Sequence, residues 1–402
     1  MKIGIAGPVS TESIKDLLEG DISTLPKGFT DAPFLAVLIK TFLRQGHQVS
    51  VYTLDFSLLP EQLAPICATG PNFKIYYSPC RKHSVRTNGK YLGRSLDFFY
   101  REIKALTIAI NIDQPDIVNG HWSYEYGLAA VYSNKPYVVT CHDSPLKVLK
   151  YMTNYYRFGR LLMALWLFKK TKALTAVSPY LKSEIAKFTN ANIDVIPNPT
   201  PLQDLKDKID RQVDLNTPKI VMLLNGFGPL KNAKPAMQAF NQVLNSKPNA
   251  TLHIFGYDFE VNGPAHKWAK ANKIDQNIHY HGPTPHAEIM MFLETATLLL
   301  HPSLEECCPM TLIESMSYGL PVIGGNKSGG VPWILNEGNA GLLLDIKDPA
   351  DIAHNVLMLL SDQSLYIDYS NKSLNRITQL FTQDTVALTY VKTYTNILNS
   401  NH

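Results

Sequence analysis

Short runs of β-branched and aromatic residues alternate with amphipathic segments along most of the chain, and this pattern constrains the fold most strongly. Strand, helix and strand in series favour a mostly parallel, doubly wound α/β sheet. The alternation stops at residues 197–218, which are rich in proline and charge, and then restarts. The expected strands are residues 2–6, 48–54, 73–77, 116–120, 136–141, 173–178 and 193–197, then 219–224, 251–256, 277–282, 297–302, 321–325 and 341–345.

Two similar Rossmann-like halves are therefore expected, with a cleft between them. A length of 402 residues also suggests two domains, since one domain usually takes about 100–200 residues. After about residue 350 the chain is expected to be helical, with a terminal helix that packs across one or both halves. We divide the chain into a domain at 1–198, a linker at 199–218, a domain at 219–375 and a returning helical segment at 376–402.

Composition and charge narrow the function classes. A net charge of +4 does not require a nucleic-acid partner, and none is expected. The five cysteines are odd in number and show no CxxC spacing, which favours a reducing compartment without structural zinc. The amino terminus lacks the apolar run of a signal peptide, and the longest apolar run, 161–168, is far shorter than a spanning helix. We expect a cytoplasmic protein without a metal ion.

Polar residues at the carboxyl ends of the first-half strands are candidates for binding, because ligands of such sheets sit there. His121 follows one expected strand, and His142 with Asp143 follows the next. Gly28 precedes a helix expected from residue 32 with Asp31 as its cap, and its backbone could approach a phosphate or sugar. The alternatives are structural histidines and an ordinary loop glycine.

In the second half the stretch EECCPMTLIES (305–315) follows an expected strand. Pro309 suits the first turn of a helix and Gly319 its end, which predicts a helix at 309–318. The free amides at its start can hold a diphosphate. Glu314, one turn further on, can reach back to ribose hydroxyls, while Glu306 can face a sugar on the other side of the phosphates. The alternative is a capped helix with surface glutamates.

The stretch HPSLEECCPMTLIESMSYGLPVIGGNKSGGVPWIL (301–335) resembles the donor-binding region of retaining glycosyltransferases of the GT-B fold, in the family 4 group. Its E-x7-E motif consists of Glu306 and Glu314. Further similarity lies in residues 219–240, 279–289, 115–127 and 136–145, so that the resemblance spans nearly the whole chain.

The resemblance implies a donor sugar linked to a nucleotide diphosphate such as UDP or GDP, a saccharide or lipid-linked acceptor, and no required metal or separate cofactor. The donor would be held by the second domain and the acceptor by the first, in the synthesis of bacterial cell-surface polysaccharide or glycoconjugate. Lys231 would neutralise the diphosphate. The arginine expected five residues ahead of it is replaced by Gly226, and Lys234 is a candidate substitute.

Further roles are implied by position in the same family. Glu306 would contact the donor sugar and His142 the transferred sugar, so these two residues and Lys231 are the catalytic candidates. The donor-binding candidates are Glu314, Cys307, Cys308, Pro309, Met310, Gly282, Pro283 and Lys234, and the acceptor-binding candidates are Gly28, His121, Trp122, Gly329 and Gly330.

Two other interpretations stay open. The basic, aromatic segment 147–172 is typical of a helix that packs its apolar face on a sheet, and the alternative is peripheral contact with an anionic membrane. A phosphorylase, an epimerase or a non-catalytic carbohydrate-binding protein could use the same fold. A nicotinamide-dependent dehydrogenase is disfavoured because no expected strand is followed by GxGxxG.

Overall fold

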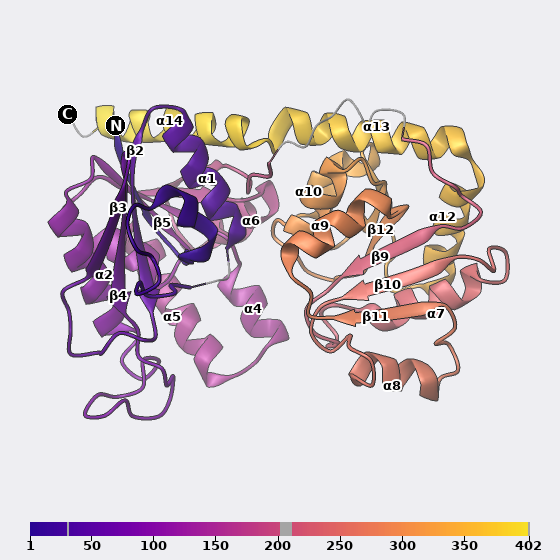
Figure 1. Cartoon of the computed structure of the whole chain (residues 1–402), viewed down its shortest axis with the longest axis horizontal. Coiled ribbons are helices and arrows are strands. Elements are labelled where there is room, and N and C mark those ends of the chain that lie inside the picture. Colours follow the sequence, from indigo (N-terminus) through magenta and orange to yellow (C-terminus); the bar gives the residue numbers. More distant parts are fainter. Residues whose placement is uncertain (30–31, 202–210, 401–402) are drawn as a thin grey trace. The chain divides into compact units, whose positions relative to one another are not determined.

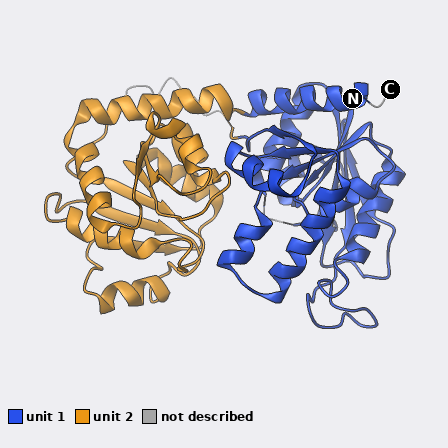
Figure 2. Cartoon of the chain, turned by 180° about the vertical axis from the view of Figure 1, so that it is seen from behind, with its two compact units in different colours: residues 1–199, 383–402 blue, residues 200–382 orange. Residues whose placement is uncertain are grey.

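The two sets of strands form two separate sheets in the computed structural model of the chain (Figure 1), which describes residues 1–29, 32–201 and 211–400. Unit 1 contains residues 1–199 and 383–402, and unit 2 contains residues 200–382 (Figure 2). The predicted α/β class with two Rossmann-like, mostly parallel sheets is confirmed.

The eight-stranded sheet of unit 1 has the order β3-β4-β2-β1-β5-β6-β7-β8, and every neighbouring pair is parallel except β3 with β4. The seven predicted strands of the first half are present, and β3 was not predicted. Residues of β3 alternate between partly buried and exposed, so the sequence of this strand lacks the continuous apolar run of a central strand. The strands are β1 (Lys2–Ala6), β2 (Gln48–Asp55), β3 (Ile66–Gly70), β4 (Phe73–Pro79), β5 (Ile117–His121), β6 (Tyr137–Cys141), β7 (Ala173–Ala176) and β8 (Asn192–Val195).

Helices cover this sheet because its central strands are buried along their length. Helices α2 and α3 pack together and against the sheet, while α1 packs against α14. Strand β5 is also joined to α14, since Asn119 Nδ2 donates to Tyr394 Oη at 2.8 Å. The segment 147–172 forms two helices instead of one. The helices are α1 (Pro33–Arg44), α2 (Tyr100–Asp113), α3 (Glu125–Tyr132), α4 (Pro145–Tyr151), α5 (Tyr155–Lys170), α6 (Pro179–Ile185) and α14 (Gln383–Ser400).

The six-stranded sheet of unit 2 is parallel throughout, in the order β11-β10-β9-β12-β13-β14. All six predicted strands are present. They are β9 (Lys219–Leu223), β10 (Thr251–Phe255), β11 (Ile278–Gly282), β12 (Leu298–His301), β13 (Val322–Gly325) and β14 (Leu342–Leu344). The helices are α7 (Ala233–Val243), α8 (Pro264–Ala271), α9 (His286–Thr295), α10 (Met310–Ser317), α11 (Val331–Ile334), α12 (Pro349–Ser361) and α13 (Gln363–Leu380).

The expected linker and returning segment differ from the observed units. Within the linker, residues 202–210 lie outside the described residues. Arg211 donates to four carbonyls of unit 2, those of Leu293, Glu294, Ala296 and Tyr318, and Val213 packs against the core of that unit. Unit 2 continues through α13 to residue 382, so the return to unit 1 begins at 383 rather than 376. Asp31, the expected cap of α1, is also outside the described residues.

Candidate active site

The start of helix α10 in unit 2 follows the carboxyl end of β12, as expected for a ligand-binding edge of a parallel sheet. The helix runs from Met310 to Ser317, slightly shorter than predicted, with Pro309 as its N-cap and no side chain capping its first amides. Because the first amides of a helix have no intrahelical acceptor, this end carries partial positive charge and favours an anion.

A cavity of about 420 Å³ opens in front of this helix start. Its volume lies within the roughly 300–1,000 Å³ typical of small-molecule sites. Both glutamates of the E-x7-E motif lie in its wall, together with the ends of three central strands. The lining residues are Leu223, Leu224, Asn225, Lys231, Phe255, Gly256, Tyr257, Pro283, Thr284, His286, Ile289, His301, Glu306, Pro309, Met310, Thr311 and Glu314.

Glu306 and Lys231 form an ion pair in this wall, with Lys231 Nζ 2.6 Å from Glu306 Oε1. The side chains are 18% and 25% exposed, so the pair is partly shielded from water but reachable by a ligand. Burial raises the pKa of the Glu306 carboxyl, but Lys231 and His301 outweigh it and hold the pKa below the usual 4.5. Lys231 is the only lysine or arginine among the described lining residues.

Glu314 lies on α10 and accepts from His286 Nε2 at 2.9 Å. The hydrogen bond to Glu314 raises the pKa of His286, against the effect of burial. The Glu314 side chain is mostly buried whereas His286 is half exposed. The carboxylate is therefore held by one partner and still borders the cavity, where its second oxygen can accept from ligand hydroxyls.

His301, the last residue of β12, was not predicted as a site residue, because it lies within the expected strand 297–302 and not after that strand. It is 2% exposed and lines the cavity. Its Nε2 lies 3.8 Å from Glu306 Oε1, but neither ring nitrogen has a hydrogen-bond partner. Burial lowers its pKa to about 4, so the ring is neutral at pH 7. The Thr311 hydroxyl, also in the wall, is likewise buried without a partner. Both groups are available to a polar ligand.

Several predicted donor-binding residues lie outside the cavity wall. Cys307 and Cys308, which precede Pro309, do not line the cavity. Gly282 does not line it either, and its amide donates to Phe259 O at 3.0 Å within the protein backbone. Lys234 lies over the rings of Phe227 and Trp268 instead. Pro283, Pro309 and Met310 do line the cavity.

Two glycine positions explain local geometry rather than ligand contact. Gly226 has φ +94°, a conformation that favours glycine over the arginine expected there. The amide of Gly330 donates to the Glu306 carbonyl at 2.7 Å, so the turn at Gly329 and Gly330 fixes the backbone that carries Glu306.

In unit 1, His121 and His142 meet at the carboxyl ends of β5 and β6, with His121 Nδ1 2.9 Å from His142 Nε2. Burial lowers the pKa of His121 to about 3, and burial together with His121 lowers that of His142, so both rings are neutral at pH 7. His121 is completely buried. It can therefore position His142 but cannot itself touch an acceptor in this conformation, and its place among the acceptor-binding residues is corrected to a supporting one.

Trp122 stands over the His142 ring, with centroids 4.3 Å apart, and Phe34 contacts both rings. The φ of Trp122 is +70°, which is unfavourable for a bulky residue. The Trp122 amide donates to Thr140 O, and this hydrogen bond holds the turn in place. Gly28 is also left-handed, and its amide already donates to Asp55 Oδ2 at 2.7 Å. The Gly28 amide therefore already has a hydrogen-bond acceptor within the protein.

Over the described ranges, no group of three or more His, Cys, Asp or Glu side chains is arranged to hold a metal ion. In the same part of the chain, no helix has the length and apolar character needed to cross a bilayer.

Two family models match consecutive parts of the sequence. The model described as Glycosyltransferase Family 4 matches residues 34–204, and the model described as Glycosyl transferases group 1 matches residues 206–376. The second match contains every residue of the cavity wall described above.

Individual relatives are distant. An N-acetyl-alpha-D-glucosaminyl L-malate synthase of Bacillus anthracis is 22% identical over 313 residues, which cover 71% of this chain and 76% of the synthase. A D-inositol 3-phosphate glycosyltransferase of Thermobifida fusca is 37% identical over 75 residues, which cover 19% of this chain and 17% of that enzyme.

Solved structures share the fold over almost the whole chain. Sucrose-phosphate synthase from Thermosynechococcus elongatus superimposes with a TM-score of 0.73 at 16% identity, covering 99% of both chains. Anabaena HepE in complex with UDP-glucose superimposes with a TM-score of 0.66 at 15% identity, covering 98% of this chain and 100% of that one. At these identities the similarity establishes the fold alone.

Proposed function

Because the chain belongs to glycosyltransferase family 4, with the group 1 domain and the GT-B fold, we propose that it transfers a sugar from a nucleotide diphosphate sugar to a saccharide or lipid-linked saccharide. Unit 2 binds the donor and unit 1 the acceptor. The observation that carries the proposal is the cavity at the start of α10, with a carboxylate on each side of it and one lysine in its wall.

The donor pose follows from the chemistry of this wall. The diphosphate takes the start of α10 and Lys231, which together offer positive charge. Glu314 accepts from the ribose hydroxyls, as carboxylates do for vicinal diols, and Glu306 accepts from hydroxyls of the donor sugar. The complex of the similar Anabaena HepE with UDP-glucose supports a donor of this class.

The proposed transfer retains the anomeric configuration. The acceptor hydroxyl oxygen bonds to the anomeric carbon on the face from which the diphosphate departs, and the breaking C–O bond leaves its electron pair on the diphosphate. The acceptor proton passes to a phosphate oxygen. Lys231 and the start of α10 stabilise the charge that develops on the leaving group, so the proposal includes catalysis without a metal ion.

The acceptor side of the proposal rests on His142 and Trp122 in unit 1. A neutral imidazole can donate one hydrogen bond and accept another, so His142 can polarise a hydroxyl. His121 occupies Nε2 of His142, and a side-chain hydrogen bond with Asn198 also holds the ring. An acceptor hydroxyl would therefore bind His142 in exchange for Asn198. Trp122 offers an aromatic face beside His142 for a sugar ring.

A lipid-linked acceptor would bring unit 1 to a membrane, so the proposal includes peripheral contact with an anionic membrane on its cytoplasmic side. The corresponding pathway class is the synthesis of cell-surface polysaccharide or glycoconjugate.

Thermal-shift screening against UDP, GDP and ADP and their sugars tests the donor site. A ligand at one hundred times its Kd adds about 2.7 kcal/mol to the stability of the folded state. For a unit of this size each kcal/mol raises the Tm by about 2–4 °C.

A second measurement tests transfer. Release of nucleoside diphosphate that requires an added acceptor supports a transferase. Donor binding without any release would favour the non-catalytic alternative, for which the replacement of the family's arginine by Gly226 is the supporting observation. Interconversion of donor sugars without an acceptor would favour an epimerase, and sugar release from a saccharide by phosphate would favour a phosphorylase. If no nucleotide shifts the Tm, the donor site is wrongly assigned.

A further inference from the structure

A second cavity, of about 650 Å³, lies wholly within unit 1 between helices α2, α3 and α5. None of the residues assigned above to donor or acceptor lines it. Its wall is mainly aromatic and aliphatic, with Phe98, Tyr100, Ile103, Leu162, Met163 and Trp166 among the lining residues. We call it the α2–α5 groove.

Helix α5 explains why the groove exists. Its residues Leu161, Ala164 and Leu167 are buried in the core, as expected for a helix packed on a sheet. On its other flank, Leu162 is 40% and Trp166 is 51% exposed. A helix with apolar residues on both flanks buries one of them within its own domain and leaves the other for a further partner.

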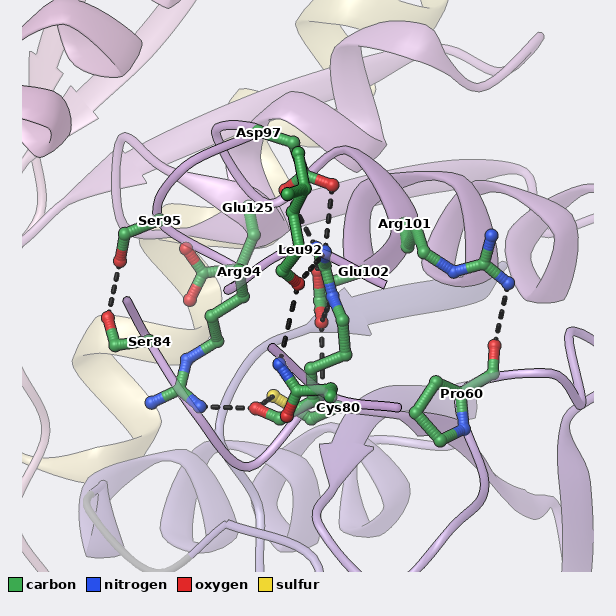
Figure 3. Close-up of polar contacts among 12 residues, drawn as sticks. Pro60, Cys80, Ser84, Leu92, Arg94, Ser95, Asp97, Arg101, Glu102 and Glu125 are labelled. Carbon is green, nitrogen blue, oxygen red and sulfur yellow. Dashed lines mark hydrogen bonds and ion pairs between the residues drawn. The ribbon is translucent and has the colours of Figure 1, made fainter. Parts of the chain in front are cut away.

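The wall opposite α5 is held in place by a buried arginine. Arg81, 1% exposed, forms ion pairs with Asp97 and Glu102, and it donates to both oxygens of each carboxylate at 2.6–2.9 Å. Figure 3 shows Asp97 and Glu102 among these contacts, and Arg94 donates to the Arg81 carbonyl. Because Asp97 precedes the turn at residues 98 and 99 and Glu102 follows it, the ion pairs with Arg81 hold both ends of this turn.

That turn directs two aromatic residues to opposite sides. Phe98 and Phe99 have φ +53° and +60°, a conformation that phenylalanine rarely adopts. As a result Phe99 is buried, while Phe98 is 47% exposed at the rim of the groove beside Tyr100. The exposed aromatic rim is thus part of a rigid arrangement.

Acidic and basic side chains both lie around the groove, and Asp97 is in its wall. Arg81 forms ion pairs with Asp97 and Glu102, and Arg160 forms one with Glu125. Lys104 lines the groove, and Lys170 lies over the Trp166 ring at 4.8 Å. Within the described part of the chain, no carboxylate forms an ion pair with Lys104, Lys169 or Lys170. An occupant must therefore be apolar in its body and anionic at its end.

We propose that the α2–α5 groove binds an acyl chain of an anionic phospholipid at a bilayer surface. Phe98, Tyr100 and Trp166 lie at the level of the headgroups, where aromatic rings with a polar edge are favoured. Lys104 in the wall and Lys170 over the Trp166 ring attract the anionic headgroups. The inference deepens the proposed function by naming the surface through which unit 1 meets a membrane.

A second copy of the chain fits the groove less well. A two-fold interface places the same surface patch against itself, so the lysine rim of one copy would face that of the other. Like charges in such contact are repulsive, whereas an anionic bilayer neutralises them.

Vesicle sedimentation of the full chain tests the proposal. We expect binding to vesicles of phosphatidylcholine and phosphatidylglycerol in equal parts, weaker binding at high salt, and little binding to phosphatidylcholine alone. The double change Lys104→Gln and Lys170→Gln should weaken binding about fivefold per lysine. The double change Leu162→Ser and Trp166→Ser should abolish sedimentation. The matched control is Ile112→Ser, since Ile112 is 59% exposed on α2 but does not line the groove.

A fluorescence measurement shows whether a chain enters the groove. Brominated acyl chains quench tryptophan on contact, so mixed vesicles with brominated chains should quench the parent protein. Trp166→Phe should lose this quenching yet still sediment, because phenylalanine preserves the apolar wall. The other three tryptophans lie outside the groove.

Each outcome decides the proposal. Failure of the parent to bind mixed vesicles, or equal binding by the Leu162→Ser, Trp166→Ser variant with an unchanged Tm, overturns it. Concentration-dependent dimerisation that this variant abolishes would assign the groove to a second copy instead. A nucleotide-induced Tm shift in the same preparations tests the donor site independently, so the two proposals fail separately.

Discussion

Replacing Lys231 with methionine is the most direct test of the donor site, because Lys231 is the only lysine or arginine among the described cavity-lining residues. Methionine keeps the length of the side chain and removes its charge. In the parent, Lys231 Nζ is 2.6 Å from Glu306 Oε1, and both side chains are at most a quarter exposed. The change therefore removes one partner of a partly buried pair and the cation proposed to meet the diphosphate.

Two effects of this change have calculable sizes. Loss of one preorganised group that stabilises the leaving group raises the barrier by roughly 3 kcal/mol, a loss of about a hundredfold or more in kcat. Loss of a charge-assisted hydrogen bond, discounted for its partial exposure, costs about 1–2 kcal/mol of stability. The Tm should fall by about 2–8 °C, since each kcal/mol corresponds to about 2–4 °C.

The pH dependence of stability gives a third readout with a definite sign. The folded pKa of Glu306 lies below 4.5 because Lys231 and His301 outweigh burial. Its stabilising contribution is therefore present above the unfolded pKa and is lost as the pH falls through the folded one. In Lys231→Met burial dominates and the pKa rises. The Tm difference between parent and variant should thus be largest near neutral pH and narrow below about pH 4.5.

The assays are initial-rate nucleotide release at saturating donor and a Tm series from neutral to acidic pH. Lys234→Met is the matched control, since Lys234 lies three residues on but over Phe227 and Trp268. It should keep the parent kcat. If Lys231→Met also kept the parent kcat, or Lys234→Met lost as much, Lys231 would not be the residue that neutralises the diphosphate.

Three further changes test other parts of the site. Glu314→Gln should raise the donor Kd about tenfold or more with little change in kcat, since hydrogen bonds to a charged group are worth about 1.5–3 kcal/mol; calorimetric titration measures it. His142→Ala should lower kcat about a hundredfold at unchanged donor Kd, and equal loss in both would contradict its role on the acceptor side. His286→Ala should remove a stabilisation that the parent has below about pH 6.5 and loses as the pH rises through the raised pKa of His286; Tm series against pH, with His279→Ala as control, measure it.

Local sequence patterns were enough to predict most of the secondary structure and the position of the proposed donor site. Thirteen strands were predicted because central parallel strands are buried on both faces and read as continuous apolar runs. Strand β3 was missed because Ile66–Gly70 is half exposed at an edge and pairs antiparallel with its neighbour. The start of α10 was located within one residue by Pro309, since proline fixes the backbone and has no amide to leave unpaired.

Contacts between residues distant in the chain were decided by the tertiary structure. The resemblance singled out Lys231, but its pairing with Glu306 spans 75 residues and no local pattern predicts it. The burial of His301 and of His121 depends on the surrounding packing, which no local pattern encodes. The α2–α5 groove likewise arises because Arg81 holds a turn far along the chain from α5. Local residue types set the strands and helix starts, because backbone preferences act over a few residues. Burial and ion pairing join distant segments, so the folded structure alone determines them.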